Sequence, residues 1–299
     1  MEKTHFKSGF VAVMGRPNVG KSSLVNRLVG QKIAAVTPRP QTTRKRQMGI
    51  LTSENAQVIF IDTPGVHQPH HKLGESMNQE ALQTLDECDL ILFIADITSP
   101  PTEEDQLLAV SLKSIRQKPP TILVLNKCDL ISSELILERQ SKFSDLIPAI
   151  DTIQVSALQG DGLEQLLASI LDKLKEGDLF FPEDQVTDLL EREIVADLVR
   201  EAALIFLRDE VPHGIAVRID QFQERNDGSA YIEITLFVEK ESHKAIVIGQ
   251  NGEMMKKIGT AARKEIESST GRKVFLRLNV KTRKNWRDDE KVLRSFGYK

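Results

Sequence analysis

Gly15-Arg-Pro-Asn-Val-Gly-Lys-Ser22 is the stretch that decides the fold. It follows a short apolar run at residues 10–14, which predicts a strand, and it leads into a helical pattern at residues 21–28. Glycines let successive backbone N–H groups point into one concave nest, and the helix that follows adds the positive end of its dipole. This order is typical of a loop that holds phosphate groups. The expected phosphate-binding residues are Gly15, Arg16, Pro17, Asn18, Val19, Gly20, Lys21, Ser22 and Ser23.

Further apolar runs and helical patterns alternate behind this loop. Continuous apolar runs are typical of strands that are buried on both faces of a parallel sheet. We expect strands at residues 58–61, 90–95, 121–125 and 152–155, and helices at residues 75–85, 103–116, 133–146 and 163–174. Strands that alternate with helices predict a doubly wound α/β domain, whose ligands sit at the carboxyl ends of the strands.

Asp62-Thr-Pro-Gly65 stands at such a strand end, about 40 residues after the phosphate loop. The Asp62 carboxylate can hold Mg²⁺ through a water molecule, while Ser22 offers its hydroxyl to the same ion and Lys21 reaches the β- and γ-phosphates. Gly65 can give its backbone N–H to the γ-phosphate. We interpret Asp62, Thr63, Pro64 and Gly65 as a switch segment rather than an ordinary turn.

Asn126-Lys-Cys-Asp129 follows the strand at residues 121–125 and selects the base. Guanine presents two adjacent N–H donors, which the Asp129 carboxylate can accept together, whereas adenine has no such pair. Lys127 can lay its aliphatic stem on the base, and Asn126 can tie this loop to the phosphate loop. Ser156-Ala157-Leu158 can supply a backbone N–H to the guanine carbonyl.

A basic loop between the first helix and Asp62 contains Gln41, Thr42 and Thr43. A threonine hydroxyl here can coordinate Mg²⁺ when the γ-phosphate is present and so order the loop. We favour Thr43 as the Mg²⁺ ligand, with Thr42 as the alternative and a plain basic loop as the other interpretation. The residue after Asp-x-x-Gly is Val66 rather than glutamine, so no side chain at that position orients the attacking water.

Composition places the chain among globular proteins with room for two domains, because 299 residues exceed the usual size of one. Residues 1–8 are charged and predict no signal peptide. The apolar run at residues 90–95 is far shorter than the ~20 residues that span a bilayer. Cys88 and Cys128 fit no zinc spacing, so we expect free thiols in the cytoplasm.

Charge divides the chain unevenly. The net charge is −3, yet residues 240–299 carry 16 Lys and Arg against 7 Asp and Glu. A basic end on an acidic body indicates a polyanionic partner, although a solvated basic face would have the same composition.

The second half predicts an RNA-binding module after a linker at residues 179–186. A helix is expected at residues 189–207, followed by strands at 215–219 and 231–238 joined through the turn Asn226-Asp-Gly-Ser229. Then come the turn Gly249-Gln-Asn-Gly252 between two helices and a strand at residues 274–280. A Gly-x-x-Gly turn allows close approach of a nucleic-acid backbone. The candidate RNA contacts are Ile246, Ile248, Gly249, Gln250, Asn251, Gly252, Lys256, Lys257 and Ile258.

Residues 9–175 resemble translation-factor-type GTPases, and the second half resembles a KH domain of the bacterial type II form. The linker Phe181-Pro-Glu-Asp184, the switch Gln41-Thr-Thr-Arg44 and the ending from Trp286 to Tyr298 look like the Era family of ribosome-assembly GTPases. That resemblance implies GTP hydrolysis with Mg²⁺ as cofactor, and binding to the 3′ end of small-subunit ribosomal RNA during assembly of that subunit. Because Val66 replaces the orienting glutamine, we expect the hydrolysis to be slow. Asn18 is similar to an asparagine that helps to hold a monovalent cation in potassium-dependent relatives. Its alternative role is to stabilise the turn.

These expectations define a GTPase domain at residues 1–178 and a KH domain with a C-terminal tail at residues 187–299. We expect a cytoplasmic monomer, with a membrane-peripheral fraction left open. We interpret Trp286 as an anchor for the last helix. The rival function is an RNA-binding scaffold whose nucleotide domain binds GTP or GDP for structure alone. A relative of tandem GTPases would need a second phosphate loop, and the sequence contains none.

Overall fold

The computed structural model describes residues 6–37, 39, 42–115 and 119–298. It divides into two compact units, whose main boundary in the chain lies between Asp188 and Leu189. The short segments Ala35–Thr42 and His70–Ser76 group with the second unit. Each unit has a hydrophobic core of its own, as expected for separate domains.

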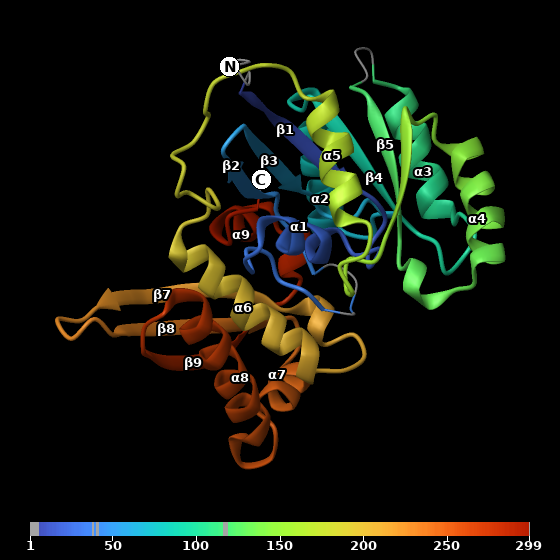
Figure 1. Ribbon diagram of the computed structural model, residues 1–299. Coiled ribbons are helices and arrows are strands. Elements are labelled where there is room, and N and C mark those ends of the chain that lie inside the picture. The colour runs from blue at the N-terminus through green and yellow to red at the C-terminus, as the bar shows by residue number, and fades with distance from the viewer. Residues whose placement is uncertain (1–5, 38, 40–41, 116–118, 299) are drawn as a thin grey trace. The chain divides into compact units, whose positions relative to one another are not determined.

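The first unit is built on a six-stranded sheet in the order β2-β3-β1-β4-β5-β6 (Figure 1). Five strands are parallel, and β2 pairs antiparallel with β3. The α/β prediction is confirmed, but the sequence analysis missed β2, whose edge position leaves it only partly buried and without a continuous apolar run. The strands are β1 (Lys7–Met14), β2 (Gln47–Ser53), β3 (Ala56–Asp62), β4 (Leu90–Asp96), β5 (Thr121–Asn126) and β6 (Asp151–Val155).

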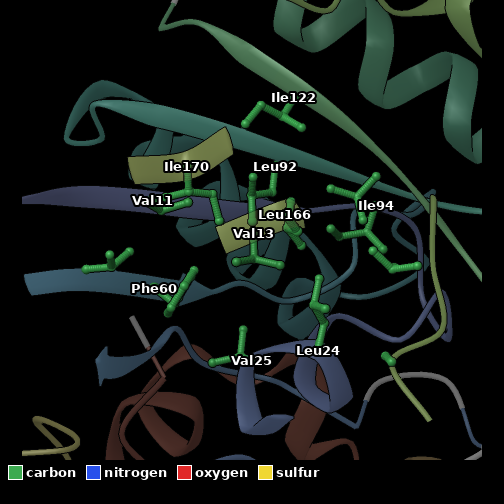
Figure 2. Packing of buried hydrophobic residues seen from close by; sticks show 14 of the residues in the cluster. Val11, Val13, Leu24, Val25, Phe60, Leu92, Ile94, Ile122, Leu166 and Ile170 are labelled. Atoms are coloured by element: carbon green, nitrogen blue, oxygen red, sulfur yellow. The ribbon is translucent and has the colours of Figure 1, made fainter. Parts of the chain in front are cut away.

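Helices cover both faces of this sheet. Side chains alternate along each strand, so Val11 and Val13 of β1 join one core cluster while Ala12 and Met14 join the other. Figure 2 shows the first cluster, in which strand residues such as Val13 pack with residues of α1 and α5. The helices are α1 (Lys21–Val29) and α5 (Leu163–Lys173) on one face, and α2 (Lys72–Gln83), α3 (Glu103–Lys113) and α4 (Ser133–Leu146) on the other.

Short 3₁₀ turns and helix ends account for the small differences from the predicted bounds. The predicted helix at residues 75–85 is found as α2 followed by η1 (Thr84–Asp86), and η2 (Cys128–Leu130) follows β5. The helix predicted at residues 103–116 ends at Lys113, and Arg116 lies outside the described residues.

The predicted linker is fastened to the first unit. Ile50 of β2 donates its backbone N–H to the carbonyl of Val186 at 2.9 Å. Gln57 of β3 donates its side-chain amide to the carbonyl of Phe181 at 2.9 Å and accepts from the backbone of Phe180. The residues predicted as a linker therefore pair with polar groups of β2 and β3.

The second unit is a three-stranded sheet in the order β7-β8-β9, with β8 antiparallel to β7 and parallel to β9 (Figure 1). One face of the sheet packs on α6 and α8 to form the core. The predicted helix–strand–strand–helix–helix–strand order is confirmed. Its elements are α6 (Glu191–Phe206), η3 (Pro212–Gly214), β7 (Ala216–Glu224), β8 (Ala230–Val238), α7 (Glu241–Ile248), η4 (Gln250–Gly252), α8 (Glu253–Thr270), β9 (Val274–Thr282), η5 (Trp286–Asp288) and α9 (Glu290–Ser295).

The C-terminal residues close one end of this unit. Trp286 is fully buried, donates its indole N–H to the carbonyl of Gly214 at 2.9 Å, and packs edge-on against Phe296. Phe296 in turn covers Phe237 of β8. The interpretation of Trp286 as an anchor is confirmed, because its ring lies in the core rather than on a surface where a base could stack.

Both cysteines are free thiols, as expected, and burial raises the pKa of Cys88 to about 12. Among the described residues, no helix combines the length and apolar character needed to cross a bilayer.

Candidate functional site

The predicted nucleotide residues converge at one edge of the first sheet. Because β1, β3, β5 and β6 are parallel, the loops that follow Met14, Asp62, Asn126 and Val155 all emerge at the same side. Four segments that are far apart in the sequence therefore form one site.

The phosphate loop closes around the side chain of Lys21. Its ammonium group donates to the carbonyls of Gly15 at 2.9 Å and Arg16 at 3.0 Å, and the residue is 6% exposed. Burial lowers the pKa of Lys21 to about 8, with the nearby Asp62 carboxylate opposing that shift. A buried ammonium held within a nest of backbone groups is stabilised by an incoming phosphate, which supplies the missing negative charge.

A small polar cluster lies next to Lys21. The Ser22 hydroxyl donates to the carboxylate of Asp62 at 2.6 Å and lies 2.8 Å from the Thr43 hydroxyl, which also reaches Asp62 at 3.2 Å. Asp62 is fully buried, and its second oxygen, Oδ1, has no hydrogen-bond partner among the described residues. Burial raises the pKa of Asp62, against the opposing effects of Lys21, Ser22 and Thr43.

These oxygen atoms fit a divalent cation. Two hydroxyls and one carboxylate are hard ligands, and the unpartnered Asp62 oxygen is a group that a hydrated Mg²⁺ would satisfy. The described residues contain no cluster of three or more His, Cys, Asp and Glu that could hold a metal by themselves. Such a site suits Mg²⁺, which keeps several waters and shares phosphate oxygens.

The structure distinguishes the two candidate switch threonines. Thr43 faces Ser22 and Asp62, whereas the hydroxyl of Thr42 donates to the carbonyl of Arg39 at 2.7 Å and lies 2.8 Å from the Thr37 hydroxyl. The geometry favours Thr43 as the cation ligand. Gln41, predicted as part of the same switch, lies outside the described residues.

The second switch segment rests against the phosphate loop. A Cβ at Gly65 would come within 2.6 Å of the backbone nitrogen of Pro17, so only glycine permits this approach. Thr63 is buried and donates to the carbonyl of Val13 at 2.8 Å, which makes it a structural residue of the segment. Pro64 and Val66 are also buried, and the Val66 side chain belongs to the core.

Asn126 joins the base loop to the rest of the site, as predicted. Its side-chain amide donates to the carbonyl of Val19 at 2.7 Å and accepts from the backbone N–H of Ala157 at 3.0 Å. Gly20 lies so close that a Cβ there would collide with this amide. One buried side chain thus fixes the phosphate loop, the strand β5 and the Ser156–Leu158 loop together.

Asp129 is exposed, in keeping with its predicted contact to guanine. Ser156 is buried, and both its backbone N–H and its hydroxyl have partners within the loop, Asp161 and Gln159 respectively. The Ala157 N–H is held by Asn126, and Leu158 is exposed.

Sequence analysis missed Asp96, which stands at the carboxyl end of β4. Its carboxylate accepts from the Lys127 ammonium at 2.6 Å and lies 3.7 Å from the guanidinium of Arg16. Burial opposes ionisation, but hydrogen bonds from Lys127 and Thr98 lower the pKa of Asp96 below its usual range. Lys127 also donates to the carbonyl of Asn18 at 2.9 Å. The signal was present, because Asp96 ends an apolar strand just as Asp62 and Asn126 do.

The side chain of Arg16 is bonded to other residues of the first unit. Its guanidinium pairs with the fully buried Asp105 at 3.3 Å, beside Asp96, and donates to Ser99. The Arg16 side chain is therefore engaged by protein groups, so Arg16 can bind a phosphate only through its backbone N–H.

A groove of about 620 Å³ marks the second unit, between α8 and the outer edge of β9. Of the predicted RNA residues, Gly252 and Lys256 line it, and the exposed Lys257 neighbours them on α8. The helix also contributes residues that were not predicted, Met255, Gly259, Thr260 and Arg263, and the strand contributes Leu276 and Leu278.

The prediction that Ile258 contacts RNA is wrong. Ile258 is fully buried in the core beneath α8. One residue is about 100° of helix, so Gly259 faces the strand instead, and a Cβ there would lie 3.3 Å from Leu278. The apolar floor of the groove is therefore formed by Gly259 of α8 with Leu276 and Leu278 of β9. Folding brings these residues, which are distant in the sequence, next to one another.

The Gly-x-x-Gly turn is open to solvent. Gly249 and Gly252 have φ angles of 73° and 78°, and the intervening Gln250 and Asn251 are exposed. A Cβ at Gly252 would meet nothing within 4 Å. Ile246 is 48% exposed and Ile248 is half-buried, so both remain accessible candidates for apolar contact with a ligand.

Family models match both halves of the chain. The model of 50S ribosome-binding GTPases matches residues 10–127, and the model of the KH domain matches residues 210–287. The chain is 47% identical to GTPase Era of Ruminiclostridium cellulolyticum over 294 residues, and 48% identical to GTPase Era of Caldicellulosiruptor saccharolyticus over 295, in each case covering 98% of both chains.

Solved structures agree. The crystal structure of Era in complex with MgGDPNP and nucleotides 1506–1542 of 16S ribosomal RNA superposes with a TM-score of 0.94 at 39% identity, covering 98% of this chain and 99% of that one. A variant of Aquifex aeolicus Era bound to GDP·AlF4⁻ gives a TM-score of 0.93 at the same identity and coverage. Full-length similarity at this level, with both site geometries in place, shows that the chain belongs to the Era family of GTPases.

Proposed function

We propose that this chain is a slow GTPase switch that binds GTP with Mg²⁺, engages the 3′ end of small-subunit ribosomal RNA and acts in assembly of the small subunit. The observation that carries the proposal is the cluster of Ser22, Thr43 and Asp62. It joins the phosphate loop to both switch segments, so binding of a γ-phosphate and its Mg²⁺ would change the contacts of all three segments.

The chain's own residues have distinct roles in this proposal. Lys21 neutralises the β- and γ-phosphates, Gly65 offers its N–H to the γ-phosphate, and Asp129 accepts the two donors of guanine. Bound Mg²⁺ would neutralise charge on the phosphates, held by Ser22 and Thr43 and by Asp62 through water. Because Val66 is buried and apolar, the attacking water lacks an orienting side chain at this position, which accounts for slow turnover.

We further propose that a monovalent cation assists hydrolysis beside Asn18. Arg16 is paired with Asp96 and Asp105, so its guanidinium is not available as an internal arginine finger. The alternative role for Asn18 is conformational, because its φ angle is 63° and asparagine tolerates that region better than most residues. Hydrolysis should be faster in potassium than in sodium at equal ionic strength, measured by phosphate release. Equal rates in both salts would assign Asn18 to the turn.

The RNA target follows from the full-length relative. The Era structure at 39% identity holds nucleotides of 16S ribosomal RNA, which belong to the small subunit. The family description that mentions the 50S subunit matches only residues 10–127, which lack the RNA groove. We therefore assign the small subunit as the partner. The basic residues Lys256 and Arg263 of the groove supply charge complementarity to RNA phosphates.

The decisive test pairs two measurements on one preparation. Fluorescence anisotropy gives the affinity for an RNA of nucleotides 1506–1542 in the presence of GDPNP and of GDP, and phosphate release gives turnover. We expect both activities, with RNA affinity that depends on the nucleotide. RNA binding without turnover would favour a scaffold with a structural nucleotide, against which the intact Lys21, Ser22, Asp62 and Asp129 already argue. Crosslinking and sequencing of bound RNA would then identify the target in cells.

We also propose a cytoplasmic monomer. Two free thiols agree with a reducing compartment. Cell fractionation and light scattering test this, and recovery of the protein with membranes would support the peripheral fraction left open by the sequence.

A further inference from the structure

An exposed aromatic and basic patch lies on the second unit, on the sheet face opposite α6 and α8. The face is set by strand alternation, because Ile232 and Val274 point into the core while their neighbours Tyr231 and Phe275 point outward. Tyr231 and Phe275 are directly paired in the β8–β9 register, so the two rings are neighbours.

Arg225 completes the patch. Its guanidinium lies 4.4 Å from the centre of the Phe275 ring and 5.6 Å from that of Tyr231. The hairpin turn holds it there, since the backbone N–H of Arg225 donates to the carbonyl of Ser229 at 2.8 Å. An arginine plane and flat rings fixed on a sheet are the groups on which unstacked RNA bases stack.

The two ends of this sheet face differ in a way that points to a ligand. At one end Phe237 is covered by Phe296 and is 7% exposed. At the other end Phe275 remains 52% exposed, although a phenyl ring gains from being buried. Among the described residues, no aromatic ring packs on Phe275 as Phe296 packs on Phe237, and the Arg225 guanidinium lies over the Phe275 ring.

The patch is continuous with the RNA groove. The groove between α8 and β9 is lined not only by Lys256 and Arg263 on the helix but also by Tyr231, Phe275 and Arg277. It therefore passes around the outer edge of β9, which pairs with β8 alone in the sheet. Arg225, Lys273 and Arg277 bring three positive charges to this region, against two carboxylates: Glu233, which lies 3.7 Å from Arg277, and Glu267, which also lines the groove.

We propose that RNA bound in the groove continues around the edge of β9 and that one of its bases, beyond the nucleotides held by the groove, stacks on Phe275 and Arg225. The assignment rests on the proposed RNA-binding function. A KH groove holds about four nucleotides, so the stacked base belongs to an extension of that segment. The ligand is single-stranded RNA, because a base inside a duplex cannot stack on a side chain.

Length-matched RNAs test the assignment in the full-length protein. Fluorescence anisotropy gives the affinity for nested fragments of nucleotides 1506–1542. The short fragments have about four nucleotides, enough to fill the groove, and the extended fragments add about three nucleotides on one side or the other. We expect extension on one side to tighten binding by about tenfold or more, the effect of one stacked base. Because Phe275 also borders the groove, Phe275→Ala should weaken the short fragment slightly, but it should abolish the gain from the extension. Phe275→Trp should keep the gain. Phe180→Ala, which removes a phenyl ring of similar exposure (54%) from the first unit, should leave every affinity unchanged.

A second measurement reports stacking directly. 2-Aminopurine placed in the extension should be quenched on binding the wild type and not on binding Phe275→Ala. If the gain survives in Phe275→Ala, the extension does not stack here, the patch becomes a candidate protein-docking surface, and the proposal is overturned. Equal weakening of short and extended fragments would also overturn it, by placing Phe275 in the groove-bound segment. If the wild type binds none of the fragments, the proposed RNA-binding function itself is refuted, and not only the stacking site.

Discussion

The phosphate loop and the Gly249–Gly252 turn are both glycine-containing loops before a helix, yet they are built in opposite ways. The phosphate loop is held from several sides, with Asn126 bonded to Val19 and Lys127 bonded to Asn18. In the turn, a Cβ at Gly252 would meet nothing, and the loop residues are exposed.

The difference reflects what each loop must bind. A nucleotide is recognised by atoms in fixed positions, so the loop around it is preorganised by the strands on either side. An RNA backbone needs an unobstructed approach, so the turn leaves space and relies on a second wall, the edge of β9. Changes to the first loop should therefore disturb many contacts, while a change at an open position of the second, such as Gly252, should affect the ligand alone.

Lys21→Ala should have the largest effect on the nucleotide side. It removes the buried ammonium that the phosphates neutralise, so productive GTP binding should be lost while the fold remains, because its bonds reach only the loop carbonyls of Gly15 and Arg16. Mant-GTP titration measures the loss, and circular dichroism checks the fold. Wild-type turnover in this variant would refute the assigned role.

Gly252→Asp should lower the RNA affinity by about tenfold or more. GTP hydrolysis of the free protein should stay nearly unchanged. The carboxylate repels RNA phosphates at the closest point of approach. Its Cβ has room, and aspartate tolerates the observed φ of 78° better than most residues, so the turn should survive.

Gly249→Ala sharpens that comparison. Its Cβ would lie 2.7 Å from that of Met254, so this variant should lose thermal stability as well as RNA affinity. RNA anisotropy, phosphate release and thermal unfolding are measured for both variants. Retained RNA affinity in folded Gly252→Asp would move the RNA surface elsewhere, with the basic segment at residues 281–287 as the next candidate.

Asp129→Asn should shift preference from guanine towards xanthine nucleotides. Xanthine keeps N1–H but replaces the 2-amino donor with an acceptor, which the asparagine amide matches. A lost donor–acceptor match that ligand binding buries costs roughly 1–3 kcal/mol, about five- to 150-fold in affinity. Competition between XTP and GTP on the variant measures this, and an unchanged preference for GTP would contradict the proposed base contact.

Asp96→Asn should have the smallest effect, a weakening of guanine-nucleotide affinity by about 1 kcal/mol, or roughly fivefold. The amide cannot pair with the Lys127 ammonium, so Lys127 loses its support beside the base, while the bonds from Thr98 can persist. The dissociation rate of mant-GTP is the readout. Asp89→Asn is the matched control, since Asp89 accepts a backbone bond from Phe10 at the opposite end of the sheet. Equal changes in the two variants would assign Asp96 to stability alone.

The sequence by itself determined five of the six strands of the first unit and most of the chemistry of its site. Its strands are continuous apolar runs, and its ligands follow those runs directly, so Lys21, Asp62 and Asn126 could be placed by local pattern. The parallel sheet then brings these strand ends together whatever the lengths of the connections between them.

Only the tertiary structure decided which way the side chains of the site point and which strand completes the sheet. It showed that the Arg16 side chain turns towards Asp96 and Asp105, that Thr43 rather than Thr42 faces Asp62, and that β2 completes the sheet from a partly exposed edge. Side-chain direction depends on partners that are distant in the sequence, which no local pattern encodes.

The RNA groove shows the same limit most clearly. Sequence located the Gly-x-x-Gly turn and the basic charge around it, but it placed Ile258 in the groove when that side chain belongs to the core. The opposite wall of the groove contains Leu276 and Leu278 of β9, whose apolar character in the sequence is that of ordinary core residues. A groove is the space left between packed elements, and its lining is fixed only when helix α8 settles on the sheet and turns Gly259 towards β9.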